Sequence, residues 1–240
     1  MRDSDLTEYL GGIEIDWTRF EAAAAQSRDC LGILTSDRAA LTALVERAVR
    51  DPALRVKCES HQLLDYLVLY DCVERGVRVR LHLSTTEHLQ RPHDHRFDFS
   101  SMILCGSYEH CIVNCKVNPY EIRDEAGARP YQDRHNPDPL IRLKNADFPV
   151  ANVRNERAGD IFSLHHSVAH TVLTAANTVS LVLRGGPRRN RSFIFDRTQE
   201  RLWWRFGQEN ESRERRAQKI MPAEQLTGIV QRLRALRVLN

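Results

Sequence analysis

The spacing of apolar residues changes near residue 60, and this change sets the fold class. In 41–49 the apolar side chains recur three or four residues apart, as on one face of a helix. In 77–84, VRVRLHLS, apolar and polar residues alternate strictly, as on a strand whose two faces differ. Further short β-prone segments lie at 65–70, 99–105, 108–117, 170–174, 179–184 and 192–196. Many short strands separated by turn signals indicate a β-sandwich or a β-barrel.

The chain of 240 residues is long enough for one barrel with helical ends. We predict a helical extension over 1–60, a barrel over 61–200 and a second helical extension over 201–240. Ser36 or Asp37 suits the start of the helix over 41–49, and Asp51-Pro52 suits its end. Pro222 suits a first helical position, and the apolar stripe that follows it predicts packing on the barrel or in a homodimer.

The segment 118–156 is polar and rich in Pro, Asn and Asp. It is too long for a hairpin turn, so we expect an extended loop at the barrel rim. Such a loop is either a lid over a site or an insertion without a role in function, and the sequence leaves both open.

Composition excludes several classes of protein. No apolar run approaches the ~18 residues that span a bilayer, and no secretory signal opens the chain, so we expect a cytoplasmic protein without a membrane partner. The six cysteines include no CxxC pair, which favours reduced thiols. From residue 184 onward, 14 Lys and Arg face 6 Asp and Glu. This excess is either solvated surface or an attraction for an anionic substrate, and no nucleic-acid motif accompanies it.

Three histidines are the candidate metal ligands. His93 and His95 are two residues apart, so on a strand both imidazoles point the same way. His170 lies in an apolar stretch, where its ring needs either a metal or a hydrogen-bond partner. Neutral imidazoles suit iron, zinc, copper or nickel.

The stretches around these histidines resemble the two motifs of the cupin family, over about residues 65–200. The first motif, G(X)5HXH(X)3-4E(X)6G, matches His93, His95 and Gly106, with Phe99 in place of the glutamate. The second, G(X)5PXG(X)2H(X)3N, matches Gly159 and His170 in spacing. The resemblance implies a mainly β, cupin-type double-stranded β-helix, or jelly-roll barrel. It also implies one divalent metal on His93, His95 and His170.

Without the glutamate, the ligand set resembles the three-histidine site of the cysteine dioxygenase-like branch. Where that branch has Ser-x-His-x-Tyr, this chain has Ser180, Val182 and Arg184. The turn LVLRGGP also resembles uncharacterised bacterial cupins. An oxoglutarate-type HxD motif is excluded, because the aspartate of HDH lies between the two histidines.

Arg184, Tyr108 and His110 are the candidate catalytic residues. Arg184 could hold an acid group of a substrate or form a salt bridge, and Tyr108 and His110 could bind substrate or line the barrel. Arg80 and His82 lie either in the cavity or on the surface. We predict an iron oxygenase acting on a small carboxylate-bearing or amino-acid-like molecule, with zinc, manganese, nickel or copper as other metals. An isomerase, a hydrolase, an enzyme forming nitrogen–nitrogen bonds and a non-catalytic binding protein are the alternatives.

Overall fold

The computed structural model describes residues 3–121, 141–207 and 210–240. Four helices precede the barrel: α1 (Asp3–Gly12), α2 (Phe20–Ser36), α3 (Arg38–Arg50) and α4 (Pro52–Arg55). Asp37 caps α3 as predicted, because its carboxylate accepts from the backbone N–H groups of Ala39 and Ala40 at 2.9 and 3.1 Å. Helices α5 (Arg213–Lys219) and α6 (Ala223–Ala235) end the chain, and short 3-10 turns lie at Val73–Arg75, Pro119–Glu121 and Asn145–Asp147.

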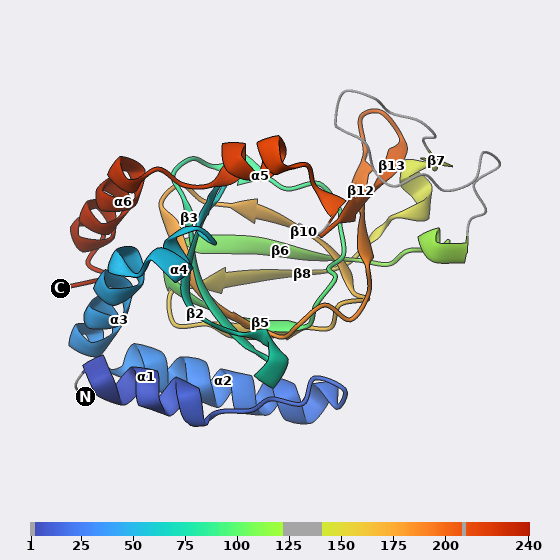
Figure 1. Ribbon diagram of the computed structural model, residues 1–240. Coiled ribbons are helices and arrows are strands. Elements are labelled where there is room, and N and C mark those ends of the chain that lie inside the picture. The colour runs from blue at the N-terminus through green and yellow to red at the C-terminus, as the bar shows by residue number, and fades with distance from the viewer. Residues whose placement is uncertain (1–2, 122–140, 208–209) are drawn as a thin grey trace.

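Two antiparallel sheets face each other and form the barrel (Figure 1). The first has the order β1 (Glu59–Ser60), β2 (Asp65–Cys72), β3 (Val77–Ser84), β11 (Thr178–Arg184), β5 (Phe99–Cys105) and β9 (Ile161–Leu164). The second has the order β4 (His88–Leu89), β10 (Ala169–Thr174), β6 (Ser107–Val113) and β8 (Val150–Arg157). A small third sheet contains β12 (Arg191–Asp196), β13 (Arg201–Phe206) and β7 (Ile141–Arg142).

The pairing of the strands defines a double-stranded β-helix. Strands β3 to β6 pair in reverse order with β8 to β11: β6 with β8, β5 with β9, β4 with β10 and β3 with β11. The chain crosses between the two sheets as it follows this path, so the barrel consists of two intertwined runs of strand. The predicted fold class, a mainly β jelly-roll barrel with helices at both ends, is confirmed.

The six-stranded sheet is covered on both faces. Its outer face packs on the helices through Val77, Val79, Leu81 and Leu83, each at most 1% exposed. Its inner face belongs to the barrel core, which contains Val182. Figure 1 shows α1 and α2 beside the barrel and α6 near α3. The apolar stripe of α6 packs into the same helical core as α3, with Pro222 at the N-cap position just before the helix.

Two segments differ from the sequence-based predictions. Strand β8, Val150–Arg157, pairs with β6, although we predicted that all but its last residue belong to the loop 118–156. All of its residues except Glu156 are exposed, so β8 carries no alternating apolar pattern. Residues 201–206, which we predicted to begin a helical extension, form β13 because they pair with β12. Residues 122–140 of the expected loop lie outside the described part of the chain.

All six cysteines are free thiols, as expected for a chain without a disulfide framework. Within the described ranges, no helix has both the length and the apolar character that a bilayer crossing requires.

Candidate metal centre

The fold brings His93, His95 and His170 together, although 75 residues separate the last two in sequence. His93 and His95 lie in the segment between β4 and β5, and His170 lies on β10. His93 and His170 exchange two backbone hydrogen bonds, each of 2.9 Å, which fix the segment against the strand. One ring nitrogen from each of the three histidines lies within 4.8 Å of the other two. The candidate ligands therefore converge as the sequence motifs predict.

Hydrogen bonds orient two of these imidazoles. The Nδ1–H group of His93 donates to the carbonyl oxygen of Arg91 at 2.7 Å, which leaves Nε2 of His93 with its lone pair. Nδ1 of His170 lies 2.8 Å from Nε2 of His110. Nδ1 of His110 lies 3.1 Å and 3.2 Å from the carboxylate oxygens of Glu156.

The Glu156 carboxylate sets the tautomers along this chain of contacts. Because an ionised carboxylate only accepts, Nδ1 of His110 carries the proton and Nε2 of His110 is an acceptor. His170 then donates through Nδ1–H and turns its unprotonated Nε2 toward the other two histidines. Carboxylate and histidine partners of this kind typically fix the orientation of metal ligands.

The three imidazoles are neutral at pH 7. Burial lowers the pKa of His93 to about 4 and holds the pKa values of His95 and His170 well below their ordinary range. Neighbouring histidines lower the pKa values of His95 and His170 further. Neutral imidazole is the form that binds transition metals.

The arrangement of the nitrogen atoms fits a metal ion. Nε2 of His95 lies 2.8 Å from Nε2 of His170. Two unprotonated nitrogens this close repel each other unless a proton or a cation lies between them. Imidazole nitrogens bound at about 2.0–2.1 Å to one ion lie about 3 Å apart, close to the observed separation.

Aromatic rings form one wall of the centre. The ring of Phe99 lies 4.8 Å from the ring of His95, measured between centroids, and Phe99 is 6% exposed within the barrel core. This confirms that Phe99 points inward and offers no ligand atom where the family motif has glutamate. Phe97 lies 5.7 Å from His95 on the same side.

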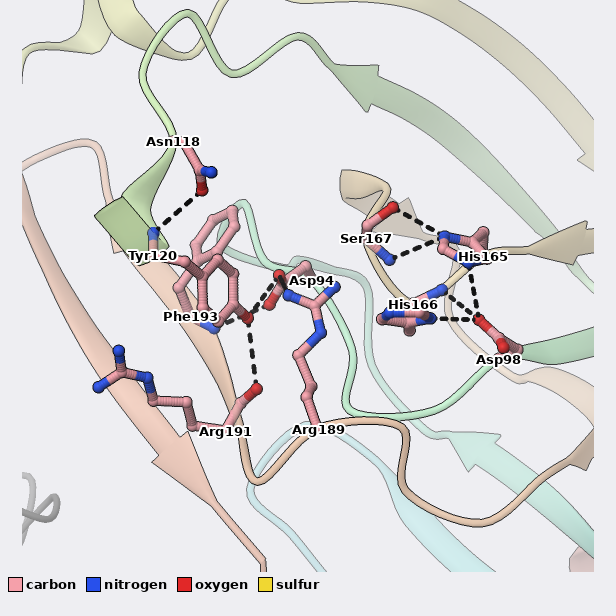
Figure 2. Close-up of polar contacts among 10 residues, drawn as sticks. All are labelled: Asp94, Asp98, Asn118, Tyr120, His165, His166, Ser167, Arg189, Arg191 and Phe193. Carbon is pink, nitrogen blue, oxygen red and sulfur yellow. Dashed lines mark hydrogen bonds and ion pairs between the residues drawn. The ribbon is translucent and has the colours of Figure 1, made fainter. Parts of the chain in front are cut away.

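Asp94 lies between the candidate ligands His93 and His95 in sequence, and its side chain points toward Tyr120 and Arg189 (Figure 2). Its carboxylate accepts from the backbone N–H of Phe193 at 2.8 Å, from the Tyr120 hydroxyl at 2.8 Å and from Arg189 at 2.9 Å. Asp94 is 2% exposed, and its bond to Phe193 anchors the segment that carries His93 and His95 to β12.

A second cluster of Asp98, His165 and His166 also brings three possible ligand atoms within 4.8 Å (Figure 2). Oδ1 of Asp98 accepts from the backbone N–H of His166 at 2.6 Å and lies 2.7 Å from Nδ1 of His166. The carbonyl oxygen of His166 accepts from the backbone N–H of His95 at 3.2 Å. These contacts fix the loop before β10, so we assign the cluster a structural role. His165 and His166 are both partly exposed.

The candidate catalytic residues occupy different positions in the barrel. Arg184 is 6% exposed, with its guanidinium carbon 4.1 Å from the centroid of the Phe97 ring. The Tyr108 hydroxyl donates to the Ser180 hydroxyl at 3.0 Å, across the barrel. His110 is fully buried, and both of its ring nitrogens contact protein partners.

Sequence reasoning missed Glu156 and left the direction of Arg80 and His82 open. Glu156 lies on a polar edge strand, where no apolar alternation marks a strand. Arg80 and His82 pair across from Val182 and Ser180, and Val182 belongs to the barrel core. Because directly opposed residues of paired strands share a face, Arg80 and His82 lie on the inner face.

No protein-family model matches the chain, and no curated protein matches it in sequence. Distant likenesses exist among solved structures. KdgF from Halomonas sp. is 12% identical, covers 55% of this chain and 88% of its own, and has a TM-score of 0.34. An RmlC-like cupin from Shewanella frigidimarina is 10% identical, covers 55% and 85%, and has a TM-score of 0.34. Ectoine synthase from P. lautus is 8% identical, covers 60% and 75%, and has a TM-score of 0.38.

The fold rests on this chain's own strand pairing. At these identities and TM-scores, none of the solved structures carries over an activity, a substrate or a ligand set. The site residues must therefore be argued from their own contacts.

Proposed function

We propose that the protein is a mononuclear metalloenzyme of the cupin type, with His93, His95 and His170 as the ligands of one divalent transition metal. The observation that carries the proposal is the convergence of three neutral imidazoles, two of which have tautomers set by fixed partners. The proposed activity is that of an oxygenase for a small carboxylate-bearing or amino-acid-like molecule. Iron(II) is the metal we favour, because its one-electron chemistry activates dioxygen.

Residues of this chain have distinct parts in the proposal. His93, His95 and His170 hold the metal, while His110 and Glu156 position His170 through its Nδ1 atom. The aromatic wall of Phe97 and Phe99 excludes water from one side of the centre. Arg184 lies against Phe97 and would hold the acid group of the substrate.

Metal analysis and oxygen uptake test this proposal together. Protein purified without oxygen is expected to contain about one iron per chain and to consume dioxygen with one member of a panel of amino acids and small carboxylic acids. Another bound metal with no oxygen uptake would favour an isomerase, a hydrolase or an enzyme forming nitrogen–nitrogen bonds. Bound metal with saturable ligand binding and no turnover would favour a binding protein. Absence of any metal would overturn the proposal.

Replacing Glu156 with alanine is expected to weaken metal binding about 10–100-fold, because His110 loses the acceptor that sets its tautomer. Glu156→Gln retains an acceptor oxygen and should restore most of the affinity. Titration with a competing chelator measures the difference. Glu109→Ala, an exposed glutamate on β6, is the matched control. Equal affinity in Glu156→Ala and in the wild type would show that Glu156 does not position His170.

Replacing Phe99 with glutamate is expected to destabilise the metal-free protein by about 3–5 kcal/mol, because a packed ring is lost and a carboxylate is buried. Added metal should then raise the melting temperature more than it does in the wild type, because the new carboxylate supplies a ligand beside His95. Glutamine has a shape similar to that of glutamate but is a poorer metal ligand. Phe99→Gln should therefore lack the larger metal-induced rise in melting temperature. Equal metal-induced shifts in the two variants would contradict the predicted ligand position.

Replacing Arg184 with lysine is expected to raise KM for the true substrate about tenfold or more, with metal content unchanged, because lysine cannot form two parallel bonds to a carboxylate. Steady-state kinetics would separate KM from kcat. A fall in melting temperature without a change in KM would instead give Arg184 a structural role.

A homodimer also stays a prediction, which light scattering would test.

A further inference from the structure

Three nitrogen-bearing side chains lie on the inner face of the six-stranded sheet, facing the barrel core. Arg80 and His82 are two residues apart on β3, and Arg184 is on β11 beside it. Arg80 pairs across from Val182, and Arg184 pairs across from Phe99 of β5. Val182 and Phe99 both belong to the barrel core, so the three side chains share the interior with the histidine centre.

Each of these three side chains contains a nitrogen that has no hydrogen-bond partner among the described residues. Nε of Arg80, Nε2 of His82 and Nε of Arg184 are all shielded from solvent and unbonded. The guanidinium of Arg184 donates from Nη1 to the carbonyl oxygen of Gly185 at 2.9 Å. An unbonded donor inside a protein costs free energy, and an uncompensated charge costs more.

Within the described residues, no carboxylate forms an ion pair with Arg80 or Arg184. Asp71 is the acid on this face of β2, across from Arg78. Arg78 binds it through two bonds of 2.5 and 2.7 Å, and Lys57 binds it at 2.6 Å. Asp71 is therefore already neutralised, and the two other arginines retain their charges.

The two unneutralised guanidinium groups repel each other. Burial and, next, the nearby Arg78 together lower the pKa of Arg80 to about 10. Burial likewise holds the pKa of Arg184 well below its ordinary range, with Arg80 as the next cause. A guanidinium group keeps its proton at pH 7, so two like charges lie inside the barrel. The nearby carboxylates, Glu59 and Asp71, already have other partners: His61 for Glu59, and Arg78 and Lys57 for Asp71.

The cluster borders space that solvent can reach, and it is close to the histidine centre. Arg80 and His82 remain partly accessible although they lie inside the barrel. His82 is near enough to His95 to contribute to its lowered pKa. The ring of Phe97 lies beside His95 at 5.7 Å and beneath the guanidinium carbon of Arg184 at 4.1 Å. The Phe97 ring therefore links Arg184 of the cluster to His95 of the histidine centre.

We infer that Arg80, His82 and Arg184 form an oxyanion site for the doubly charged acid end of a small molecule, either a dicarboxylate or a phosphate. Two guanidinium groups match two negative charges, and their planar forks suit carboxylate and phosphate oxygens. The identity of this molecule as the substrate rests on the proposed function. Binding of the anion itself does not, because none of the three side chains is a proposed metal ligand.

The test uses the full chain without metal and measures thermal shift and calorimetric binding of inorganic phosphate and succinate. Acetate at matched ionic strength is the reference for a single charge. Phosphate or succinate is expected to raise the melting temperature saturably, and acetate is not. Tighter binding of inorganic phosphate would identify the ligand as a phosphate, and tighter binding of succinate would identify it as a dicarboxylate. No saturable shift with either anion would overturn the inference.

Variants locate the binding. Arg80→Met and His82→Phe are each expected to lower the affinity for the anion. The loss for Arg80→Met should be about tenfold or more, because a charge-assisted hydrogen bond is lost. Arg80→Lys keeps the charge but not the planar guanidinium, so its affinity for the anion should lie between those of the wild type and Arg80→Met. Arg50→Met, which removes an exposed arginine at the end of α3, should bind as the wild type does. Undiminished anion binding in Arg80→Met and His82→Phe would also overturn the inference.

Stability without anion separates binding from a structural role. Arg80→Met should melt at the same temperature as the wild type or higher, because it removes an uncompensated buried charge. A lower melting temperature would show that Arg80 is structural and would contradict the inference. Metal binding and anion binding of the wild type, measured separately, distinguish the two proposals. Metal binding without anion binding rejects the oxyanion site alone, and anion binding without metal binding rejects the metal centre alone.

Discussion

Replacing His170 with alanine is expected to abolish metal binding. The wild type should hold about one transition metal per chain, and the variant should fall to background in elemental analysis after gel filtration. His170 supplies one of three ligands and is the one that the His110–Glu156 pair orients. Loss of a direct ligand should exceed the ~10–100-fold effect of losing an outer partner. His93→Ala should behave in the same way.

His165→Ala is the matched control for this prediction, because it removes another histidine from the loop that leads into β10. Metal content should stay near one per chain in that variant. The opposite pattern, with metal lost in His165→Ala and kept in His170→Ala, would place the ion at the Asp98 cluster. Circular dichroism checks that each variant is folded, and His95→Gln tests the same centre with a smaller change in volume.

Replacing Asp94 with alanine is expected to lower the free energy of unfolding by about 3–5 kcal/mol. Three donors lose their acceptor: the backbone N–H of Phe193, the hydroxyl of Tyr120 and the guanidinium of Arg189. Burial raises the pKa of Asp94 to about 6, so the ionised carboxylate is itself held at a cost. The stranded donors outweigh that cost, and urea denaturation at pH 7 measures the net loss.

Asp94→Asn separates these effects, because the amide keeps one acceptor oxygen and loses the charge. The free energy of unfolding should therefore fall less in Asp94→Asn than in Asp94→Ala. Asp29→Ala removes an exposed aspartate from α2 and should change the free energy of unfolding by less than about 0.5 kcal/mol. Metal affinity should also fall in Asp94→Ala, because the segment that carries His93 and His95 loses its anchor on β12. Wild-type stability in Asp94→Ala would show that the hydrogen bonds of Asp94 are not what holds this segment.

Local pattern was enough to predict most of the elements. The alternation in 77–84 produced β3 with its predicted bounds, because a sheet covered on both faces still separates apolar from polar side chains. Asp37 lies at the start of α3 and Asp51 at the start of α4, because each carboxylate accepts from backbone N–H groups that a helix start leaves free. Motif spacing also indicated which three histidines would meet.

Long-range packing decided what local pattern could not. Alternation showed that Arg80 and His82 share a face, but only the pairing of β3 with β11 showed that this face lines the barrel. Glu156 lies on an exposed edge strand, where burial imposes no apolar period, and its contact with His110 spans 46 residues.

The sequence by itself therefore determined the type of most elements and the set of candidate ligands, because both depend on residues close together in the chain. Tertiary structure alone decided which side chains support those ligands and which face the interior. The physical reason is that the two sheets must close around a core before Arg80, Arg184 and Glu156 acquire neighbours, and those neighbours come from strands distant in sequence.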